Sequence, residues 1–198
     1  MKKYRNEVLK IIDEVFDTQI ENMEKASNLL VKAVENKNSI FIFGSSHAGI
    51  LSEEAFYRAG GFALINPLFS PNLMLNVKPI TFTSDLEQLE GYGRIFFKTF
   101  DLKKNDVLII HSVSGRNPVS IEIAEEADKI GVKIIVITNI KYSKSVTSRH
   151  QNEKKLYEFG SIIIDNCGEI GDAAVKLDGL EQRVAPTSTV IGVMILNS

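Results

Sequence analysis

The sequence predicts a doubly wound α/β domain in which helices cover a parallel sheet. Two observations lead to this fold class. Continuous apolar, β-branched runs, which are typical of strands buried on both faces, stand at residues 39–43, 107–111, 132–138 and 161–165. Segments with helical spacing separate these runs, and alternation of strand and helix favours parallel pairing through right-handed crossovers.

Composition sets the outer bounds of function. The chain has 198 residues, is 44% hydrophobic and carries 23 Lys and Arg against 25 Asp and Glu. This balance argues against nucleic-acid binding through a broad basic face, and no apolar run approaches the roughly 20 residues that span a membrane. The single Cys167 excludes an internal disulfide and a cysteine-cluster metal site. We predict a cytoplasmic protein with no nucleic-acid or membrane partner, no metal and no cofactor.

Residues 1–36 are predicted to form a helical arm in front of a domain at residues 37–198. Apolar side chains recur at helical spacing from Val8 to Val34, and an unbroken helix of that length would reach roughly 50 Å. We therefore expect the arm to overhang its domain or to bend near Asp17 and Thr18. An overhanging apolar stripe predicts a homodimer or homotetramer, and a helix hairpin packed on its own sheet is the alternative.

The first predicted strand, at 39–43, is followed by a serine loop. Gly44 allows a tight turn, and Ser45 and Ser46 are placed to cap the helix that follows. Capping serines begin many helices that bind nothing, so this loop alone is a weak signal. A second serine loop after another buried strand makes the signal stronger, because loops at the carboxyl ends of parallel strands converge on ligands.

That second loop follows the strand at 107–111. Ser112, Ser114 and Asn117 add hydroxyl and amide donors to the free backbone N–H groups at the start of the next helix, where Pro118 suits the first position. The helix dipole adds partial positive charge. Such a site suits a phosphate.

The remaining segments are predicted more coarsely. The irregular region from Phe62 to Tyr92 is either a substrate-facing loop or a packed connector, and the sequence assigns no chemistry to its Glu87 or Glu90. Further predicted elements are a short strand at 62–65, a helical turn at 85–90, helices at 92–100 and 118–130, a loop or short helix at 143–149, a turn at 154–159, and a capped helix after Pro186. The abrupt end of that last helix suggests a longer natural chain or contact with a neighbouring subunit.

Four titratable residues have a structural interpretation beside a functional one. His111 ends a buried strand, where a hydrogen-bonded core histidine is the default, and His150 lies in a polar segment that predicts a surface position. Glu169 and Asp172 follow the last strand. They could approach a ligand, or Asp172 could accept hydrogen bonds within a local turn.

The two loops, FGSSHAG and HSVSGRN, resemble those of the sugar isomerase (SIS) domain. The whole chain is similar to a bacterial group of phosphosugar-binding SIS proteins related to phosphoheptose isomerase. The later motifs that carry this likeness are residues 165–168, 171–173 and 186–189. The resemblance implies a five-stranded, flavodoxin-like α/β/α sandwich that dimerises and binds a phosphorylated sugar at the strand ends.

By position, the resemblance also implies which residues act. The phosphate-binding residues would be Ser45, Ser46, Ser112, Val113, Ser114, Gly115 and Asn117. Asn117 stands where Thr is common, and Arg116 stands where Glu is frequent. Acid-base candidates are His47, Glu53 and Glu54, although their spacing does not reproduce the metal-binding His and Glu of phosphoheptose isomerase.

The function predicted from the sequence is binding of a sugar phosphate with aldose-ketose isomerisation. A phosphosugar-sensing module without catalysis is one alternative. The other is a lyase or etherase that acts on an N-acetylated amino sugar phosphate. No Walker A, G-x-G-x-x-G, H-E-x-x-H or G-x-S-x-G pattern supports a different chemistry.

Overall fold

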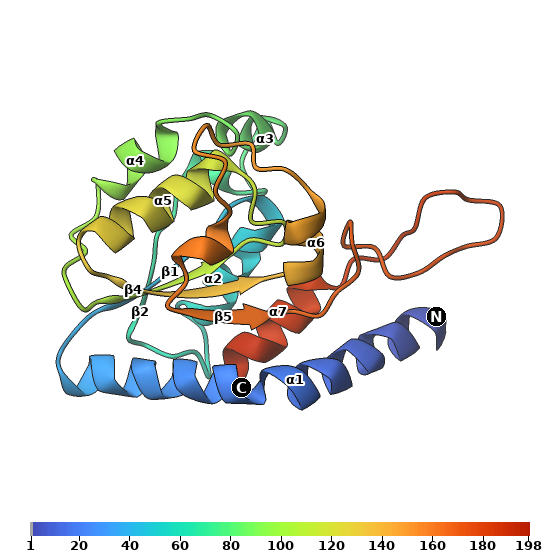
Figure 1. Cartoon of the computed structure of the whole chain (residues 1–198), viewed down its shortest axis with the longest axis horizontal. Coiled ribbons are helices and arrows are strands. Elements are labelled where there is room, and N and C mark those ends of the chain that lie inside the picture. The colour runs from blue at the N-terminus through green and yellow to red at the C-terminus, as the bar shows by residue number, and fades with distance from the viewer. Residues whose placement is uncertain (1) are drawn as a thin grey trace.

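The computed structural model describes residues 2–198 and contains one parallel sheet between layers of helices (Figure 1). Its strand order is β2-β1-β3-β4-β5, with every neighbouring pair parallel. This confirms the predicted five-stranded α/β/α sandwich. The strands are β1 (Ile40–Gly44), β2 (Ile65–Pro67), β3 (Val107–His111), β4 (Lys133–Thr138) and β5 (Ile162–Asp165).

The two faces of the sheet bury separate cores, as the alternation along β3 shows. Leu108 and Ile110 point into a core that includes helices α4 (Tyr92–Phe97) and α5 (Pro118–Lys129). Val107 and Ile109 point into the other core, which includes α1 (Lys2–Glu35), α2 (Ile50–Ala55) and α7 (Ser188–Asn197). The shorter helices are α3 (Phe82–Leu86) and α6 (Ile140–Ser145), with single 3₁₀ turns at η1 (Ser46–Gly49), η2 (Pro71–Leu73) and η3 (Leu156–Phe159).

Helix α1 is one uninterrupted helix of 34 residues, so the helix-hairpin alternative is wrong and the chain does not break at Asp17 or Thr18. Its N-terminal part extends away from the sheet, beneath a long loop at residues 174–186 (Figure 1). Tyr4 Oη donates a hydrogen bond to the carbonyl of Pro186 at 2.9 Å and ties the two together. The division of the chain after residue 36 stays a prediction.

Two short elements lie elsewhere than predicted. The edge strand β2 covers Ile65–Pro67 instead of 62–65, because Asn66 and Pro67 pair with β1 instead of turning away from it. An edge strand tolerates proline, since one side of it needs no ladder donor. The helical turn expected at 85–90 is α3, which begins earlier and ends at Leu86.

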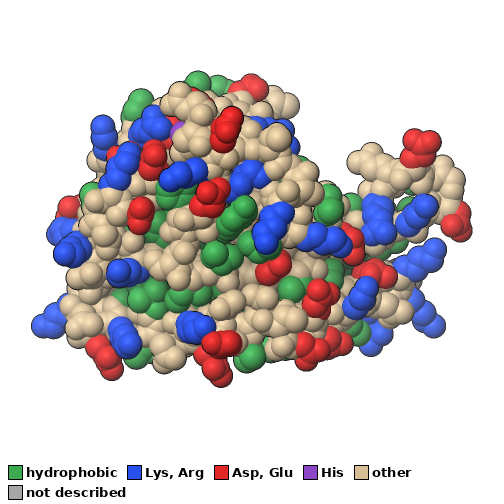
Figure 2. Space-filling view, in the orientation of Figure 1, with side chains coloured by type: hydrophobic (Ala, Val, Ile, Leu, Met, Phe, Trp, Pro, Cys, Tyr) green, Lys and Arg blue, Asp and Glu red, His purple; other side chains and the backbone are tan. Residues whose placement is uncertain are grey.

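None of the helices in residues 2–198 combines the length and the apolar character needed to span a bilayer. On the face shown in Figure 2, basic and acidic side chains are interspersed instead of gathered by sign.

Candidate functional site

The two serine loops meet at the point where the strand order reverses. The loops leave the carboxyl ends of β1 and β3, which are neighbouring strands with Gly44 paired to His111. Chain connections leave this point in opposite directions, toward β2 and toward β4. Open α/β sheets bind ligands in the crevice at such a switch point.

The carbonyl groups of the second loop are held by the neighbouring chain. Thr138 Oγ1 donates to the carbonyls of Ser112 at 2.6 Å and Val113 at 3.1 Å, and the Leu156 amide donates to the Gly115 carbonyl at 2.9 Å. Gly115 has a φ of 57°, in the left-handed region that glycine adopts easily. These bonds fix the loop with its carbonyls turned into the protein.

The N–H groups of the same loop have no such partners. Within residues 2–198, no amide from Val113 to Asn117 donates a hydrogen bond, and the hydroxyls of Ser112 and Ser114 make none either. Pro118 begins the twelve-residue helix α5, so the loop also lies at the positive end of a helix dipole. A row of free donors at a helix N-terminus is an arrangement that binds anions.

The first loop is arranged differently. Ser45 Oγ donates to Glu87 Oε2 at 3.1 Å, and the Ser46 hydroxyl lies 2.9 Å from that of Thr83. Neither serine caps a helix through its side chain, so the predicted capping role is wrong. The local capping preference is overridden by partners on and beside α3. Gly44 is needed here, because a Cβ atom would lie 2.4 Å from the Ala48 carbonyl oxygen.

Glu87 is the carboxylate that the structure brings between the two loops. Besides the bond from Ser45, its backbone carbonyl accepts a hydrogen bond from the Val119 amide on α5 at 3.3 Å. Burial raises the pKa of Glu87 above its usual 4.5, against the opposing effects of the Ser45 hydrogen bond and the positive charges of His47 and Arg149. A half-buried carboxyl with a raised pKa beside an anion loop is a candidate acid or base.

Two arginines lie at the second loop, one within it and one from a distant segment of the chain. Arg149 Nη1 donates to Asn117 Oδ1 at 2.9 Å, and the Arg149 amide donates to the Arg116 carbonyl at 2.9 Å. Neither guanidinium has a carboxylate within 4.0 Å in the described chain, and Arg116 Nε is buried without a partner. The loop therefore combines free donors with unpaired positive charge, which suits an anion.

Residues 3–139 match the family model of the SIS domain, and this match spans the first four strands and both serine loops. The chain belongs to the SIS domain family. A UPF0309 protein of Shouchella clausii is 50% identical over 198 residues, which make up 100% of this chain and 80% of the relative.

Solved structures share the fold at low sequence identity. The phosphoheptose isomerase of Neisseria gonorrhoeae has a TM-score of 0.62 and 14% identity, with 96% of this chain and 89% of that chain covered. A phosphoheptose isomerase of Francisella tularensis also has a TM-score of 0.62 and 14% identity, with 98% and 91% covered. At this identity the likeness shows the SIS fold alone.

The predicted acid-base candidates of this SIS domain are dispersed. His47 is exposed in the first loop, close enough to Glu87 to influence its pKa. Glu53 is exposed on α2, and Glu54 forms an ion pair with Arg58 four residues later. Of these candidates, the structure brings His47 near Glu87, whereas Glu54 is paired with Arg58 outside the site.

The other two histidines are buried. His111 is fully enclosed, and its Nδ1 lies 3.1 Å from the Ala48 carbonyl, which ties β3 to the first loop. Burial lowers the pKa of His111 from 6.5 to about 4, so the ring is neutral near pH 7. The predicted surface position of His150 is wrong, because it packs, 4% exposed, against Arg94 and Glu122.

Glu169 and Asp172 have structural partners. Glu169 lies 3.6 Å from Lys141 and 3.8 Å from Arg183. Asp172 accepts hydrogen bonds from the Ser188 amide at 2.9 Å and the Thr187 amide at 3.1 Å, and it thereby caps α7. Asp172 is therefore an acceptor for the start of α7, 15 and 16 residues along the chain, and not within a local turn as the sequence suggested.

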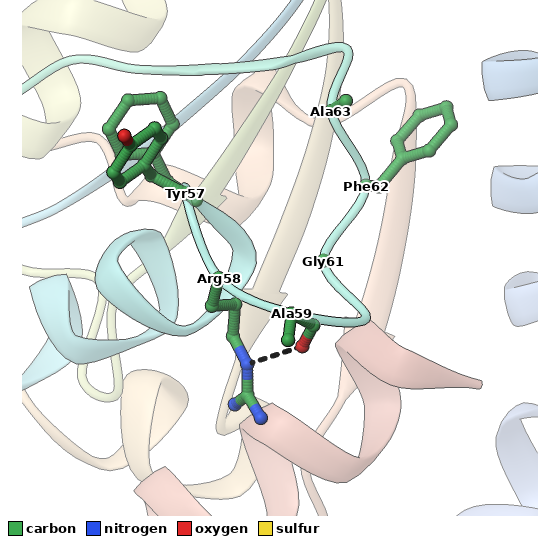
Figure 3. A pocket seen from close by; sticks show the side chains of 7 residues that line it. Tyr57, Arg58, Ala59, Gly61, Phe62 and Ala63 are labelled. Carbon is green, nitrogen blue, oxygen red and sulfur yellow. Dashed lines mark hydrogen bonds between the residues drawn. The ribbon is translucent and has the colours of Figure 1, made fainter.

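Two hollows lie apart from the serine loops. One, of about 400 Å³, is lined by the segment from Phe56 to Ala63, where Arg58 Nε donates to the Ala59 carbonyl (Figure 3). The other, of about 520 Å³, lies between α1 and the 174–186 loop. Neither is lined by a serine-loop residue, so the candidate site is described by its donors.

Proposed function

We propose that this SIS domain binds a phosphorylated sugar, with the phosphate on the second serine loop. The observation that carries the proposal is the row of free amides from Val113 to Asn117 at the start of α5, together with the free hydroxyls of Ser112 and Ser114. Charge-assisted hydrogen bonds from such donors to phosphate oxygens are strong. Arg116 and Arg149 supply the positive charge that a dianion requires. Ser45 and Ser46 of the first loop would contact the sugar side of the ligand.

The reaction we propose is aldose-ketose isomerisation, with Glu87 as the acid-base residue. A base removes the proton from the carbon beside the carbonyl, and the same group returns it to the neighbouring carbon after an enediol forms. A carboxyl whose pKa is raised toward neutrality is better matched to this task than an ordinary one. In this proposal His47 assists proton transfer between the sugar oxygens. Both solved relatives compared above are phosphoheptose isomerases, which favours this reaction class.

Two other functions use the same phosphate site. A lyase or etherase acting on an N-acetylated amino sugar phosphate would also need a carboxylate such as Glu87. A sensor without catalysis would not need a half-buried carboxyl with a raised pKa between the loops, so Glu87 favours an enzyme.

A thermal-shift screen in phosphate-free buffer tests the proposal. Hexose, heptose and amino-sugar phosphates are compared with the same sugars without phosphate. A ligand at 100 times its dissociation constant adds about 2.7 kcal/mol to the free energy of unfolding, which is readily measured. We expect at least one sugar phosphate, and not its free sugar, to raise the melting temperature. Equal effects of both forms would contradict a phosphate site. Exchange of the substrate C–H proton in D₂O then separates the enzyme from the sensor.

We also propose that copies of this chain associate through α1. Leu9, Phe16, Ile20, Val31 and Val34 are each at least 40% exposed on this helix, which makes an apolar stripe without a partner in the described chain. Light scattering at micromolar concentration should give the mass of a dimer or tetramer, and a monomer mass would contradict this. The cytoplasmic location stays a prediction.

A further inference from the structure

Helix α5 contains a fully buried carboxylate, Glu122, that lies outside the site described above. Its Oε1 accepts a hydrogen bond from the Gly91 amide at 2.6 Å, and its Oε2 accepts from the Gly93 amide at 2.9 Å and the Arg94 amide at 3.3 Å. Arg94 Nη1 lies 3.6 Å from Oε1. A buried carboxylate with this many donors holds the start of α4 firmly against α5.

The same carboxylate faces His150. The Asn152 amide donates to His150 Nδ1 at 3.2 Å, and Arg94 Nη2 lies 3.3 Å from His150 Nε2. That nitrogen is 3.6 Å from Glu122 Oε1. Glu122 therefore contacts a second segment of chain, residues 148–152, through His150.

Both segments held by Glu122 lead into the candidate site. Arg149 precedes His150 and donates to Asn117, and Glu87 lies four residues before Gly91. The two segments are also joined to each other, because the Gln151 amide donates to Glu90 Oε1 at 2.6 Å. The buried network thus connects the chain that carries the guanidinium to the chain that carries the candidate acid.

The backbone of α4 at Gly93 also lies very close to α5. A Cβ atom on Gly93 would lie 2.6 Å from the Val119 carbonyl oxygen and 2.8 Å from Glu122 Cβ. Only glycine allows α4 to approach α5 at this distance. Small displacements of Glu122 are therefore transmitted to its neighbours instead of being absorbed.

We propose that Glu122 is a positioning residue: through His150 it holds Arg149 beside the second serine loop, and in this way it strengthens phosphate binding without touching the ligand. The proposal rests on the proposed function, because it requires an anion on that loop. Arg149 lacks an ion-paired carboxylate of its own in residues 2–198, so its place depends on its bond to Asn117 and on the backbone that carries it.

Glutamine cannot replace Glu122 in this role, although it has the same shape. Both oxygens of Glu122 receive N–H donors, from Gly91 on one side and from Gly93 on the other. The amide group of glutamine would turn its own N–H₂ toward one set of donors and leave them unpaired. We expect the Glu122→Gln variant to loosen the 148–152 segment while α5 stays in place.

The test is a double-variant cycle with inorganic phosphate as the probe, measured by calorimetric titration at constant ionic strength. The four proteins are the unaltered chain, Glu122→Gln, Arg149→Ala and the chain with both substitutions. We expect Glu122→Gln to weaken phosphate binding about tenfold when Arg149 is present and less than twofold when it is absent, since interacting residues are not additive. Glu126→Gln on the same helix, where Glu126 pairs with Lys129, is the control and should leave the affinity unchanged.

A role in general stability alone would give a different result. In that case Glu122→Gln would weaken binding equally with and without Arg149, and this outcome would overturn the proposal, as would unchanged affinity in the single variant. If Glu122→Gln does not fold, His150→Phe keeps an aromatic ring and removes both ring nitrogens, with them the contact of Nε2 with Glu122 and the bond from the Asn152 amide, and the same cycle with Arg149→Ala applies. A lack of phosphate binding by the unaltered chain would overturn the proposed function itself, and this is visible before any variant is made.

Discussion

The two serine loops are similar in sequence and in position, and yet the serine hydroxyls of one have partners in the protein and those of the other have none in residues 2–198. In the first loop the hydroxyls of Ser45 and Ser46 are bonded to Glu87 and Thr83. In the second loop the hydroxyls of Ser112 and Ser114 are free. Both loops follow paired strands, so the sheet alone does not cause the difference.

The difference comes from what packs against each loop. The carbonyls of the second loop are bound by Thr138, Asn139 and Leu156, which turns its amides outward. The first loop instead faces α3 and the chain after it, which supply polar partners for its side chains. One loop therefore presents free donors, while the other bonds to a carboxylate of the protein.

The largest expected effect follows from removing the free hydroxyls. We predict that Ser112→Ala combined with Ser114→Ala weakens phosphosugar binding by roughly 2–4 kcal/mol, because charge-assisted donors are lost. The melting temperature without ligand should hardly change, since neither hydroxyl has a partner to lose. Calorimetric titration of a sugar phosphate measures the first quantity and thermal unfolding the second. Unchanged affinity would mean that the two loops do not differ in the way described.

A second prediction concerns the carboxylate that the first loop holds. Because its pKa is raised, Glu87 keeps its proton to higher pH in the folded chain than in the unfolded chain, so its contribution favours folding at low pH and is lost as pH rises from 4.5 through the folded pKa. The free energy of unfolding of Glu87→Gln relative to the unaltered protein should therefore increase with pH above 4.5. Urea unfolding between pH 4.5 and 7.5 measures this, and parallel curves for the two proteins would contradict it.

The smallest expected effect on phosphate binding comes from removing a hydroxyl of the first loop. Ser46→Ala should lower the free energy of unfolding by about 0.5–1.5 kcal/mol, because its hydroxyl is bonded to that of Thr83. Affinity for inorganic phosphate should stay within about twofold, since that anion does not need the bonded hydroxyl. Calorimetric titration of inorganic phosphate, applied to this variant and to the serine pair, checks this. A loss as large as that of the Ser112 and Ser114 variant would show that the first loop also holds the phosphate.

The sheet could be predicted from the sequence because its signals are local. Every residue of β3 is buried, so its sequence is a nearly continuous apolar run, and the small polar residues after it indicate the loop. The direction of the serine side chains could not be predicted. Ser45 and Ser46 follow a local capping rule in the sequence, but their partners come from about forty residues away.

The missed residues share a physical reason. Glu87 and Arg149 lie in irregular segments, and Glu122, although it is on the predicted helix α5, has its partners Gly91 and His150 in such segments, so nothing in the spacing of the sequence indicates these contacts. The wrong prediction for His150 has the same cause. Its polar neighbours in the sequence suggest a surface position, but Arg94 and Glu122 pack against it in the fold. Burial of such charged groups is decided by tertiary partners and not by local sequence.

The most direct measurement is a titration of inorganic phosphate followed by the backbone amide resonances of the isotopically labelled protein. The amides of Val113–Asn117 are free in the described structure, so we expect their resonances to shift together and to saturate as phosphate is added. The amides of the first loop should shift less. A saturable shift confined to the first loop, or no shift at Val113–Asn117, would contradict the assignment of the second serine loop as the phosphate site.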